Sequence, residues 1–356
     1  MYSDEDIQSA VSAGALSADA ASALREHVAR RRAMPAGDEE HFRLITGFND
    51  IFVTIAAAMI LVAMAGIGQV FTPSLYVPPP FSGVLIAGAA WTMAEFFTRL
   101  RRMALPSIVL LLAFVGGVFE ACIGFSAMLV DFSEENQVAA TLLGAGSGLI
   151  AAAAAWIHWR RFMVPITVAA GAAALTITAL ALVAAVVGPD SRSPDVLVAL
   201  VFIAGLAVFA VAMRWDMSDR SRQTRRSDVA FWLHLLAAPM IAHPLFHWLG
   251  VTQGDNIGIA AVVGVLVVYV ALGLVALAID RRALLVSALA YVLAALTWLF
   301  DRFGAVKLNV ALTALVIGSA LLTLSAFWTP IRRAIVAMLP DSLQTKVPTT
   351  RLAAAT

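Results

Sequence analysis

Apolar residues in this chain gather in long runs, which are separated by short polar segments that hold most of the charges. Most runs extend over about 17–25 residues, the length that an α-helix needs to cross a bilayer. A transmembrane strand would instead alternate polar and apolar positions over about ten residues, and no segment does so. The pattern predicts an all-α, polytopic transmembrane helical bundle of about ten spans, near residues 51–71, 82–98, 106–130, 137–157, 164–187, 195–213, 229–249, 256–279, 283–300 and 308–328.

Composition supports this class and narrows the chemistry. Hydrophobic residues make up 61% of the chain and charged residues 13%, whereas soluble domains average about 45–50% and about 25%. Cys122 is the single cysteine, so an internal disulfide or a cysteine-based zinc site cannot form. The chain has no phosphate-binding glycine loop, HExxH motif or serine elbow. We therefore expect a non-enzymatic protein without a cofactor or nucleic-acid partner, whose main partner is the lipid bilayer.

The positions of the basic residues predict the orientation. All but three of the 24 lysines and arginines lie before the first span or after an even-numbered span; the exceptions are Arg192, Arg302 and Lys307. Because cytoplasmic loops retain lysine and arginine during insertion, both termini are predicted to be cytoplasmic. The chain then divides into a cytoplasmic helical head with a linker at 1–48, the bundle at 49–330 and a cytoplasmic tail at 331–356.

Three of the predicted cytoplasmic turns resemble one another. The segments "RLRRMALPSIVLLLAF", "HWRRFMVPITVAAGAAA" and "IDRRALLVSALAYVLAA" each place an arginine pair shortly before a new apolar run. Pro106 and Pro165 stand at helix starts, where a missing amide hydrogen has no cost. Either short cytoplasmic turns look alike in any multi-span protein, or the hairpin arose by internal duplication.

Small residues predict where the helices approach closely, because leucine gains little from leaving lipid for another leucine. The fourth and fifth spans carry Gly144, Gly148 and Gly171 among many alanines. We expect close helix packing there, without a specific dimerisation motif.

Residues 4–33 predict a small helical hairpin that precedes the bundle. Gly14 ends its first helix, and Ser17 can cap the second, which has Asp19 in its first turn. The stretch "DIQSAVSAGALSADAASAL", followed by many spans, resembles bacterial predicted multi-pass inner-membrane proteins of unknown function. This resemblance covers the layout and the short head, implies a location in the bacterial inner membrane and carries over no functional residue. The head is either a module that contacts a protein partner or the membrane surface, or a solvated tether.

Two carboxylates lie within predicted spans. Glu95 stands four residues before Arg99, close to the cytoplasmic end of its helix, and is predicted to form a helical ion pair. Glu120 lies past the middle of its span and has no basic neighbour there. Because charges inside hydrocarbon are costly, Glu120 is expected to be protonated or hydrogen-bonded to another helix.

The stretch "FWLHLLAAPMIAHPLFHW" places three histidines at different depths of the seventh span. His243 and His247 are four residues apart, the spacing of one helical face, but Pro244 removes an amide donor between them. His234 lies nearer the cytoplasmic end. Three interpretations remain open: the histidines form hydrogen bonds to neighbouring helices, they bind a metal ion, or His243 forms a protonatable pair with Glu120.

Glu120, His243, His247 and His234 are therefore the candidate intramembrane polar site, with no catalytic residue and no metal site predicted. Transport of a small solute or ion is the first functional hypothesis, with this site facing a cavity. A membrane-anchored scaffold or sensor, whose cytoplasmic head binds a protein partner, is the alternative. A lipid-modifying enzyme of the membrane is disfavoured, because polar residues do not cluster at one interface.

Overall fold

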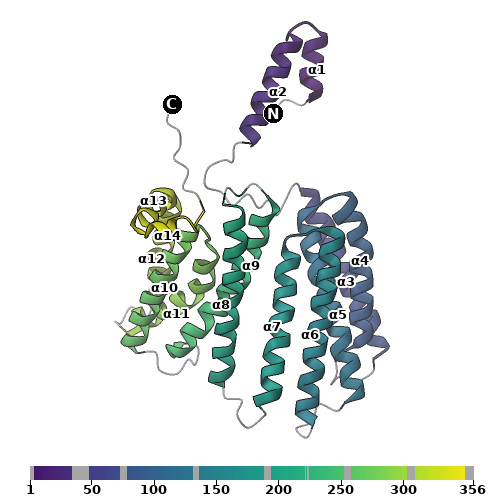
Figure 1. The fold of residues 1–356 in the computed structure, drawn as a ribbon, viewed down its shortest axis with the longest axis vertical. Helices are drawn as coiled ribbons and strands as arrows, with labels where there is room; N and C mark the ends of the chain where they lie inside the picture. The colour runs from purple at the N-terminus through teal and green to yellow at the C-terminus, as the bar shows by residue number, and fades with distance from the viewer. Residues whose placement is uncertain are drawn as a thin grey trace. The chain divides into compact units, whose positions relative to one another are not determined.

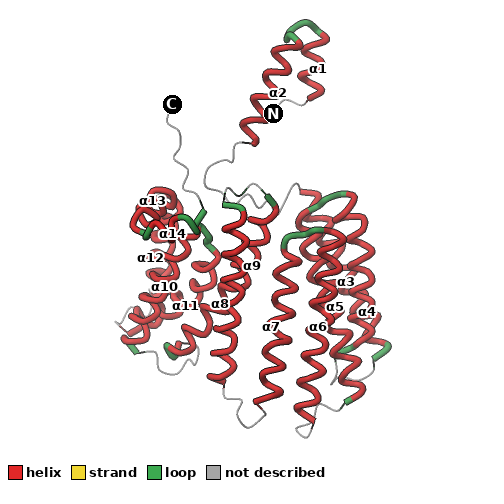
Figure 2. Tube along the Cα trace, in the orientation of Figure 1, coloured by secondary structure: helices red, strands yellow, loops and turns green. Residues whose placement is uncertain are grey.

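The structure, a computed structural model, describes residues 4–33, 48–72, 78–130, 136–187, 194–220, 222, 224–251, 258–302 and 309–348 (Figures 1 and 2). Within these ranges all regular secondary structure is helical, and turns and short loops join the helices. The described residues fall into two compact units, one up to Ala33 and one from Phe48 onward. The predicted all-α, multi-span helical class is confirmed.

The smaller unit is a hairpin of α1 (Asp4–Ser12) and α2 (Ala18–Ala33). Gly14 adopts a positive φ of 71° in the turn, a conformation that favours glycine. The Ser17 hydroxyl accepts a hydrogen bond from the Ala20 amide at 3.1 Å, which is the predicted cap. Ala21 is buried and Leu24 remains 43% exposed, so the described side chains of the hairpin enclose little apolar surface.

The larger unit contains nine helices that are long and apolar enough to cross a membrane, as judged on the described residues by length and composition. Each coincides with one of the first nine predicted spans. Most run from one end of the unit to the other, in alternating directions (Figure 1). They are α3 (Phe48–Val70), α4 (Pro80–Ala94) with its continuation η1 (Glu95–Leu100), α5 (Ala104–Leu129), α6 (Gln137–Phe162), α7 (Ile166–Val187), α8 (Pro194–Ser218), α9 (Arg225–Trp248), α10 (Ile259–Ile279) and α11 (Ala283–Arg302).

The tenth predicted span differs from a straight crossing. Helix α12 (Asn309–Ala326) is followed at once by α13 (Trp328–Met338), and the two helices meet at an angle of 74°. Residues 331–338, assigned from the sequence to a tail, belong to α13, which buries Trp328, Arg332 and Val336 along one face. The short α14 (Asp341–Gln344) follows. The C-terminal segment is therefore packed against the bundle as far as Pro348.

Four arginine-bearing turns lie at one end of the larger unit, because each follows an even-numbered span; we call this the arginine-rich end (Figure 1). They join α4 to α5 through η1, α6 to α7, α8 to α9 and α10 to α11. In each turn one residue other than glycine has a left-handed backbone conformation, with φ between 53° and 58°: Arg102, Met163, Arg222 and Asp280. The resemblance among the turns therefore extends from sequence to backbone geometry.

Small residues bring several helices into close contact, as the sequence predicts for lipid-embedded packing. A Cβ atom added to Gly83 would lie 2.4 Å from backbone atoms of α5, and one added to Gly148 would lie 2.5 Å from the Thr178 hydroxyl of α7. The predicted close approach at Gly148 is thus confirmed. A Cβ atom on Gly144 or Gly171 would make only ordinary contacts, at 3.9 and 3.5 Å.

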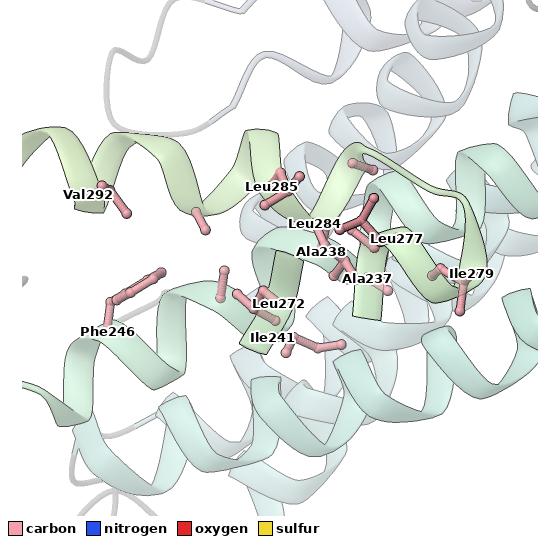
Figure 3. Packing of buried hydrophobic residues seen from close by; sticks show 14 of the residues in the cluster. Ala237, Ala238, Ile241, Phe246, Leu272, Leu277, Ile279, Leu284, Leu285 and Val292 are labelled. Carbon is pink, nitrogen blue, oxygen red and sulfur yellow. The ribbon is translucent and has the colours of Figure 1, made fainter. Parts of the chain in front are cut away.

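The largest apolar core lies where α9 packs against its neighbours (Figure 3). Ala237, Ala238, Ile241 and Phe246 of α9 are almost fully buried there. They pack with residues of α10 and α11 that include Leu272, Leu277, Leu284, Leu285 and Val292. More than half of the most apolar window of α9 is buried, compared with 17% for α3 and α8. Because α9 is packed on several sides, the polar side chains that it carries are held in fixed positions inside the bundle.

The contact between α4 and α5 can be tested at two glycines of the same helix. We expect Gly83→Ala to destabilise the bundle by about 1–3 kcal/mol, because the new methyl group overlaps backbone atoms that cannot move aside. Gly88→Ala is the matched control, since a Cβ atom there meets no atom within 4 Å. Denaturant unfolding in detergent micelles measures both. Equal stability of the two variants would contradict the close approach.

Candidate functional site

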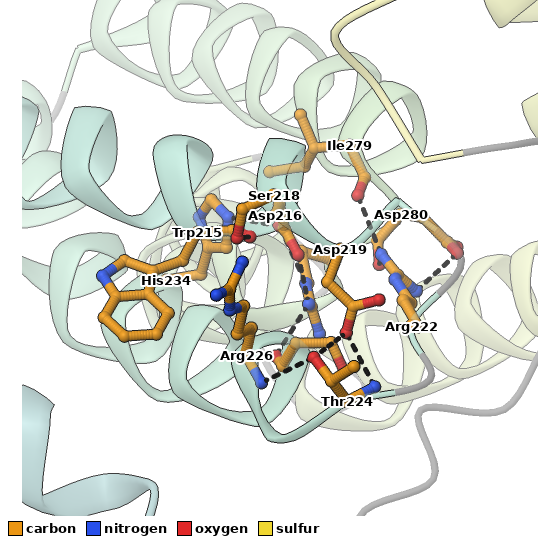
Figure 4. Close-up of polar contacts among 12 residues, drawn as sticks. Trp215, Asp216, Ser218, Asp219, Arg222, Thr224, Arg226, His234, Ile279 and Asp280 are labelled. Carbon is orange, nitrogen blue, oxygen red and sulfur yellow. Dashed lines mark hydrogen bonds and ion pairs between the residues drawn. The ribbon is translucent and has the colours of Figure 1, made fainter.

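Among the described residues, a buried cluster of charged and polar side chains is formed by Asp216, His234 and Arg281, and we call it the Asp216 cluster. Figure 4 shows Asp216 and His234 within it. The three residues are 1%, 0% and 3% exposed. His234 Nε2 lies 2.9 Å from Asp216 Oδ2. Arg281 donates from Nη2 to Asp216 Oδ1 at 2.6 Å and from Nε to Oδ2 at 3.3 Å. One carboxylate therefore holds a guanidinium and an imidazole at the same time.

Three elements supply these side chains. Asp216 is two residues from the end of α8, and His234 is nine residues after the start of α9. Arg281 comes from the turn between α10 and α11, and its Nη2 also donates to the Ser227 carbonyl at 3.0 Å. The last contact adds a side-chain hydrogen bond to a carbonyl in the first turn of α9. The cluster thus ties α8, α9 and the α10–α11 turn together.

His234 is left with one unsatisfied nitrogen. Because Asp216 accepts hydrogen bonds as a carboxylate, Nε2 of His234 carries the hydrogen and Nδ1 keeps a lone pair. Nδ1 is buried and has no hydrogen-bond partner in the described part of the chain. The neighbouring Phe209 ring, whose centroid lies 5.1 Å away, presents no acceptor or donor. The site therefore contains an unused proton acceptor inside a helical bundle.

A second group, the Asp280 cluster, lies next to the first along the chain. Asp280 Oδ2 accepts a hydrogen bond from Arg222 Nη1 at 2.7 Å, and Oδ1 accepts one from Trp328 Nε1 at 2.8 Å. Arg332 Nε lies 3.6 Å from Asp280 Oδ1. The left-handed backbone of Asp280 is tolerated better by aspartate than by larger residues. This cluster joins the α8–α9 turn to α13.

Backbone carbonyls of the C-terminal segment complete the arginine-rich end. Arg220 donates to the carbonyls of Val347 and Gln344, at 3.0 and 3.2 Å. Arg332 donates to the Pro348 carbonyl at 2.8 Å. Arginines that the sequence assigns to topology alone therefore also hold the end of the chain in place.

The structure does not bring the four predicted site residues together. Glu120 is half-buried on α5 and has no hydrogen-bond or ion-pair partner among the described residues. His243 is exposed, and its Nδ1 lies 2.6 Å from the Tyr291 hydroxyl of α11. His247 Nε2 lies 3.3 Å from Oδ1 of Asp195, at the other end of α9 from the Asp216 cluster. Of the predicted residues, His234 alone enters the Asp216 cluster.

The sequence also predicts an ion pair at Glu95 and leaves open a metal site at His243 and His247. The predicted ion pair of Glu95 with Arg99 is confirmed, at 3.3 Å, and Arg161 of α6 adds a two-point contact at 2.7 and 2.9 Å. His243 and His247 do lie near each other, with ring centroids 6.4 Å apart. Among the described residues, however, no group of three or more histidine, cysteine or acidic side chains is placed to hold a metal ion.

A second buried histidine, not predicted as a site residue, lies in the first half of the bundle. His158 of α6 is fully buried among the rings of Trp91, Phe114 and Phe162, with centroid distances of 4.5–6.2 Å. Its Nδ1 lies 3.3 Å from the Thr167 hydroxyl, and its Nε2 has no partner in the described ranges. Unlike His234, this ring has no carboxylate bonded to it among the residues that the structure describes.

Sequence inspection overlooked Asp216 and Arg281 for a physical reason. Arg281 belongs to an arginine pair that topology explains, and Asp216 lies in a charged segment, "RWDMSDRSRQTRRSD", that reads as a polar loop. The available signal was an acidic residue at the end of an apolar run, facing a histidine at a similar depth on the next helix. Such a pairing becomes visible only when the two helices are placed side by side.

No protein-family model, no curated protein and no solved structure matches this chain. The resemblance of the short head to inner-membrane proteins is therefore not accompanied by a matching family. Any function has to follow from the geometry of the chain's own residues.

Removing one charge from the Asp216 cluster is expected to destabilise the fold strongly. Asp216→Asn removes the negative charge with which the buried Arg281 guanidinium pairs, which costs about 3–5 kcal/mol. Glu95→Gln, the same chemical change in an exposed ion pair, should change stability little. Chemical unfolding of both purified variants compares them. A similar loss of stability in both would show that burial of the Asp216 cluster is not what matters.

Proposed function

We propose that this chain is a multi-span protein of the bacterial inner membrane, with cytoplasmic termini, that moves a small solute or ion in exchange for or together with protons. The single observation that carries the proposal is the buried imidazole of His234, whose Nε2 is bound to the Asp216 carboxylate while Nδ1 has no partner among the described residues. Ionisable residues inside helical membrane bundles commonly serve proton relays or substrate pathways.

An unsatisfied nitrogen is a poor choice for a group that serves stability alone. Leaving a buried acceptor without a hydrogen bond costs about 1–3 kcal/mol. The Asp216–Arg281 pair is already neutral and well bonded without the imidazole. A histidine at this position is explained by reversible protonation of Nδ1. Protonation there would create an imidazolium whose other nitrogen still faces the Asp216 carboxylate.

The same geometry offers a link between protonation and movement. A proton on His234 adds a positive charge beside the Arg281 guanidinium, and the two cations then share one carboxylate. Repulsion between like charges in a buried site favours weakening of the contact between Asp216 and Arg281. Since Arg281 belongs to the α10–α11 turn, that change would loosen this turn from α8 and α9. Alternating access needs two such arrangements.

The test uses proteoliposomes that contain a trapped pH indicator. Gradients of Na⁺, of K⁺ and of a panel of amino acids and sugars are imposed in turn, and at least one is expected to drive proton movement through the intact protein. In His234→Gln the amide can still donate to Asp216 but cannot accept a proton at neutral pH. We expect its proton flux to fall at least tenfold.

The controls for this test are the two other intramembrane candidates. His243→Gln and Glu120→Gln should retain most of the flux, because neither residue contacts the Asp216 cluster. Loss of flux in Glu120→Gln with full activity in His234→Gln would move the proton site to α5. Absence of any driven proton movement in the intact protein would overturn the transport proposal.

A second candidate function rests on the helical head. Residues 4–33 form a compact unit of their own, yet Ala21 is the one almost fully buried apolar residue among their described side chains. Units of fewer than about 40 residues rarely bury enough surface to fold unaided. A head that needs an additional surface for stability suits a scaffold or sensor whose head binds a protein partner.

The second candidate predicts that the head is unstable in isolation. A peptide of residues 1–36 should show little helical circular dichroism at 25 °C in dilute buffer, because short helices without packing are marginal in water. A bundle that lacks residues 1–33 should keep the unfolding midpoint of the full chain. A cooperative thermal transition of the isolated peptide would remove the need for a partner.

A further inference from the structure

A groove lies at the arginine-rich end between α11, α12 and the start of α13. Its volume is about 190 Å³. Leu285 and Leu289 form the α11 wall, and Leu321 and Leu324 form the α12 wall. The bend of 74° between α12 and α13 carries Trp328 over the end of the groove. The groove is therefore apolar along the spans and polar where the spans end.

Arg282 lies at this polar end and differs from its neighbours in the same turn. Asp280 and Arg281 are bound within the Asp280 cluster and the Asp216 cluster, respectively. Arg282 is exposed, makes no ion pair with the described residues, and places its guanidinium 4.7 Å from the centre of the Trp328 ring. Stacking on Trp328 fixes the direction of the side chain without neutralising its charge. A positive charge is thus held at the mouth of an apolar groove.

We propose that this groove binds an anionic phospholipid of the surrounding leaflet, with the lipid phosphate at Arg282 and part of one acyl chain between α11 and α12. Guanidinium groups bind phosphate oxygens in a two-point geometry. Basic pockets between spans at the membrane surface are suited to acidic head groups, and tryptophan favours the same level of the bilayer. The proposal requires the bundle to be embedded in lipid and is independent of proton movement.

The size and lining of the groove favour a lipid over a soluble anion. An apolar cavity of about 150 Å³ is enough to hold a molecule the size of benzene. The groove can therefore enclose a segment of one acyl chain, and the rest of the lipid stays in the bilayer. A free phosphate ion would gain nothing from the four leucines. Val286 at the rim is 65% exposed, which leaves the groove accessible from the lipid side.

A bound lipid would also contact the segment that closes the arginine-rich end. Trp328 is the residue that stacks on Arg282 and donates to Asp280. A head group on Arg282 would thus lie beside the elbow between α12 and α13. Lipid binding is expected to stabilise this elbow by simple linkage, because the ligand binds the folded state.

The test measures the binding of lipid to the full-length protein in an uncharged detergent. Added dioleoylphosphatidylglycerol should raise the thermal unfolding midpoint at concentrations at least fivefold lower than dioleoylphosphatidylcholine. In Arg282→Gln the half-saturating concentration of phosphatidylglycerol should rise at least fivefold, whereas Arg282→Lys should lose less. Arg160→Gln is the matched control, since Arg160 also stacks on an aromatic ring, that of Trp156 at 5.2 Å, but lines no part of this groove.

A second variant tests the apolar part of the site. Val286→Trp places a large ring over the exposed rim of the groove without entering the core, and should weaken binding of both lipids. Each variant is first compared with the parent protein without lipid, by elution volume and unfolding midpoint. The proposal fails if phosphatidylglycerol and phosphatidylcholine bind equally, if Arg282→Gln binds as tightly as Arg160→Gln, or if inorganic phosphate stabilises the protein as well as phosphatidylglycerol does.

Discussion

The structure depends on the pairing of charges that the bundle buries at one end. An isolated guanidinium or carboxylate cannot leave water without a large free-energy cost, so each must meet an opposite charge with good hydrogen-bond geometry. Asp216 meets this requirement for Arg281, and Asp280 does so for Arg222. Arg332 lies within ion-pair distance of Asp280, at 3.6 Å, and its hydrogen bond goes to the Pro348 carbonyl. These contacts join helices that lipid-facing apolar surface alone would not hold in a fixed arrangement, because such surface gains little by leaving lipid.

Three consecutive residues of the α10–α11 turn show how this constraint shapes the arginine-rich end. The left-handed backbone at Asp280 ends α10 and directs its side chain toward Arg222 and Trp328. Arg281 points into the bundle toward Asp216, and Arg282 stays outside over the Trp328 ring. One tight turn therefore serves a structural cluster, a candidate proton site and a candidate lipid site.

The position of His234 connects this architecture to the proposed function. The His234 imidazole shares a carboxylate with a guanidinium and keeps one nitrogen without a partner among the described residues. Its charge can therefore change while the ring stays inside the bundle. His243 and His247 differ, since their partners are a tyrosine hydroxyl and a largely exposed carboxylate. Depth along the span alone did not identify the histidine of the proposed proton site. The presence of an acidic partner on the adjacent helix did, together with complete burial.

The sequence by itself determined the helical class, the positions of nine spans and the grouping of the arginines in alternate turns, because these depend on residue type over one helix length. It also determined local contacts such as the Glu95–Arg99 pair and the Ser17 cap, which join residues a few positions apart. Only the tertiary structure decided that Asp216, His234 and Arg281 meet and that α12 gives way to a sharply bent α13. Those features depend on the rotation and packing of helices about their axes, which a pattern of apolar runs leaves open.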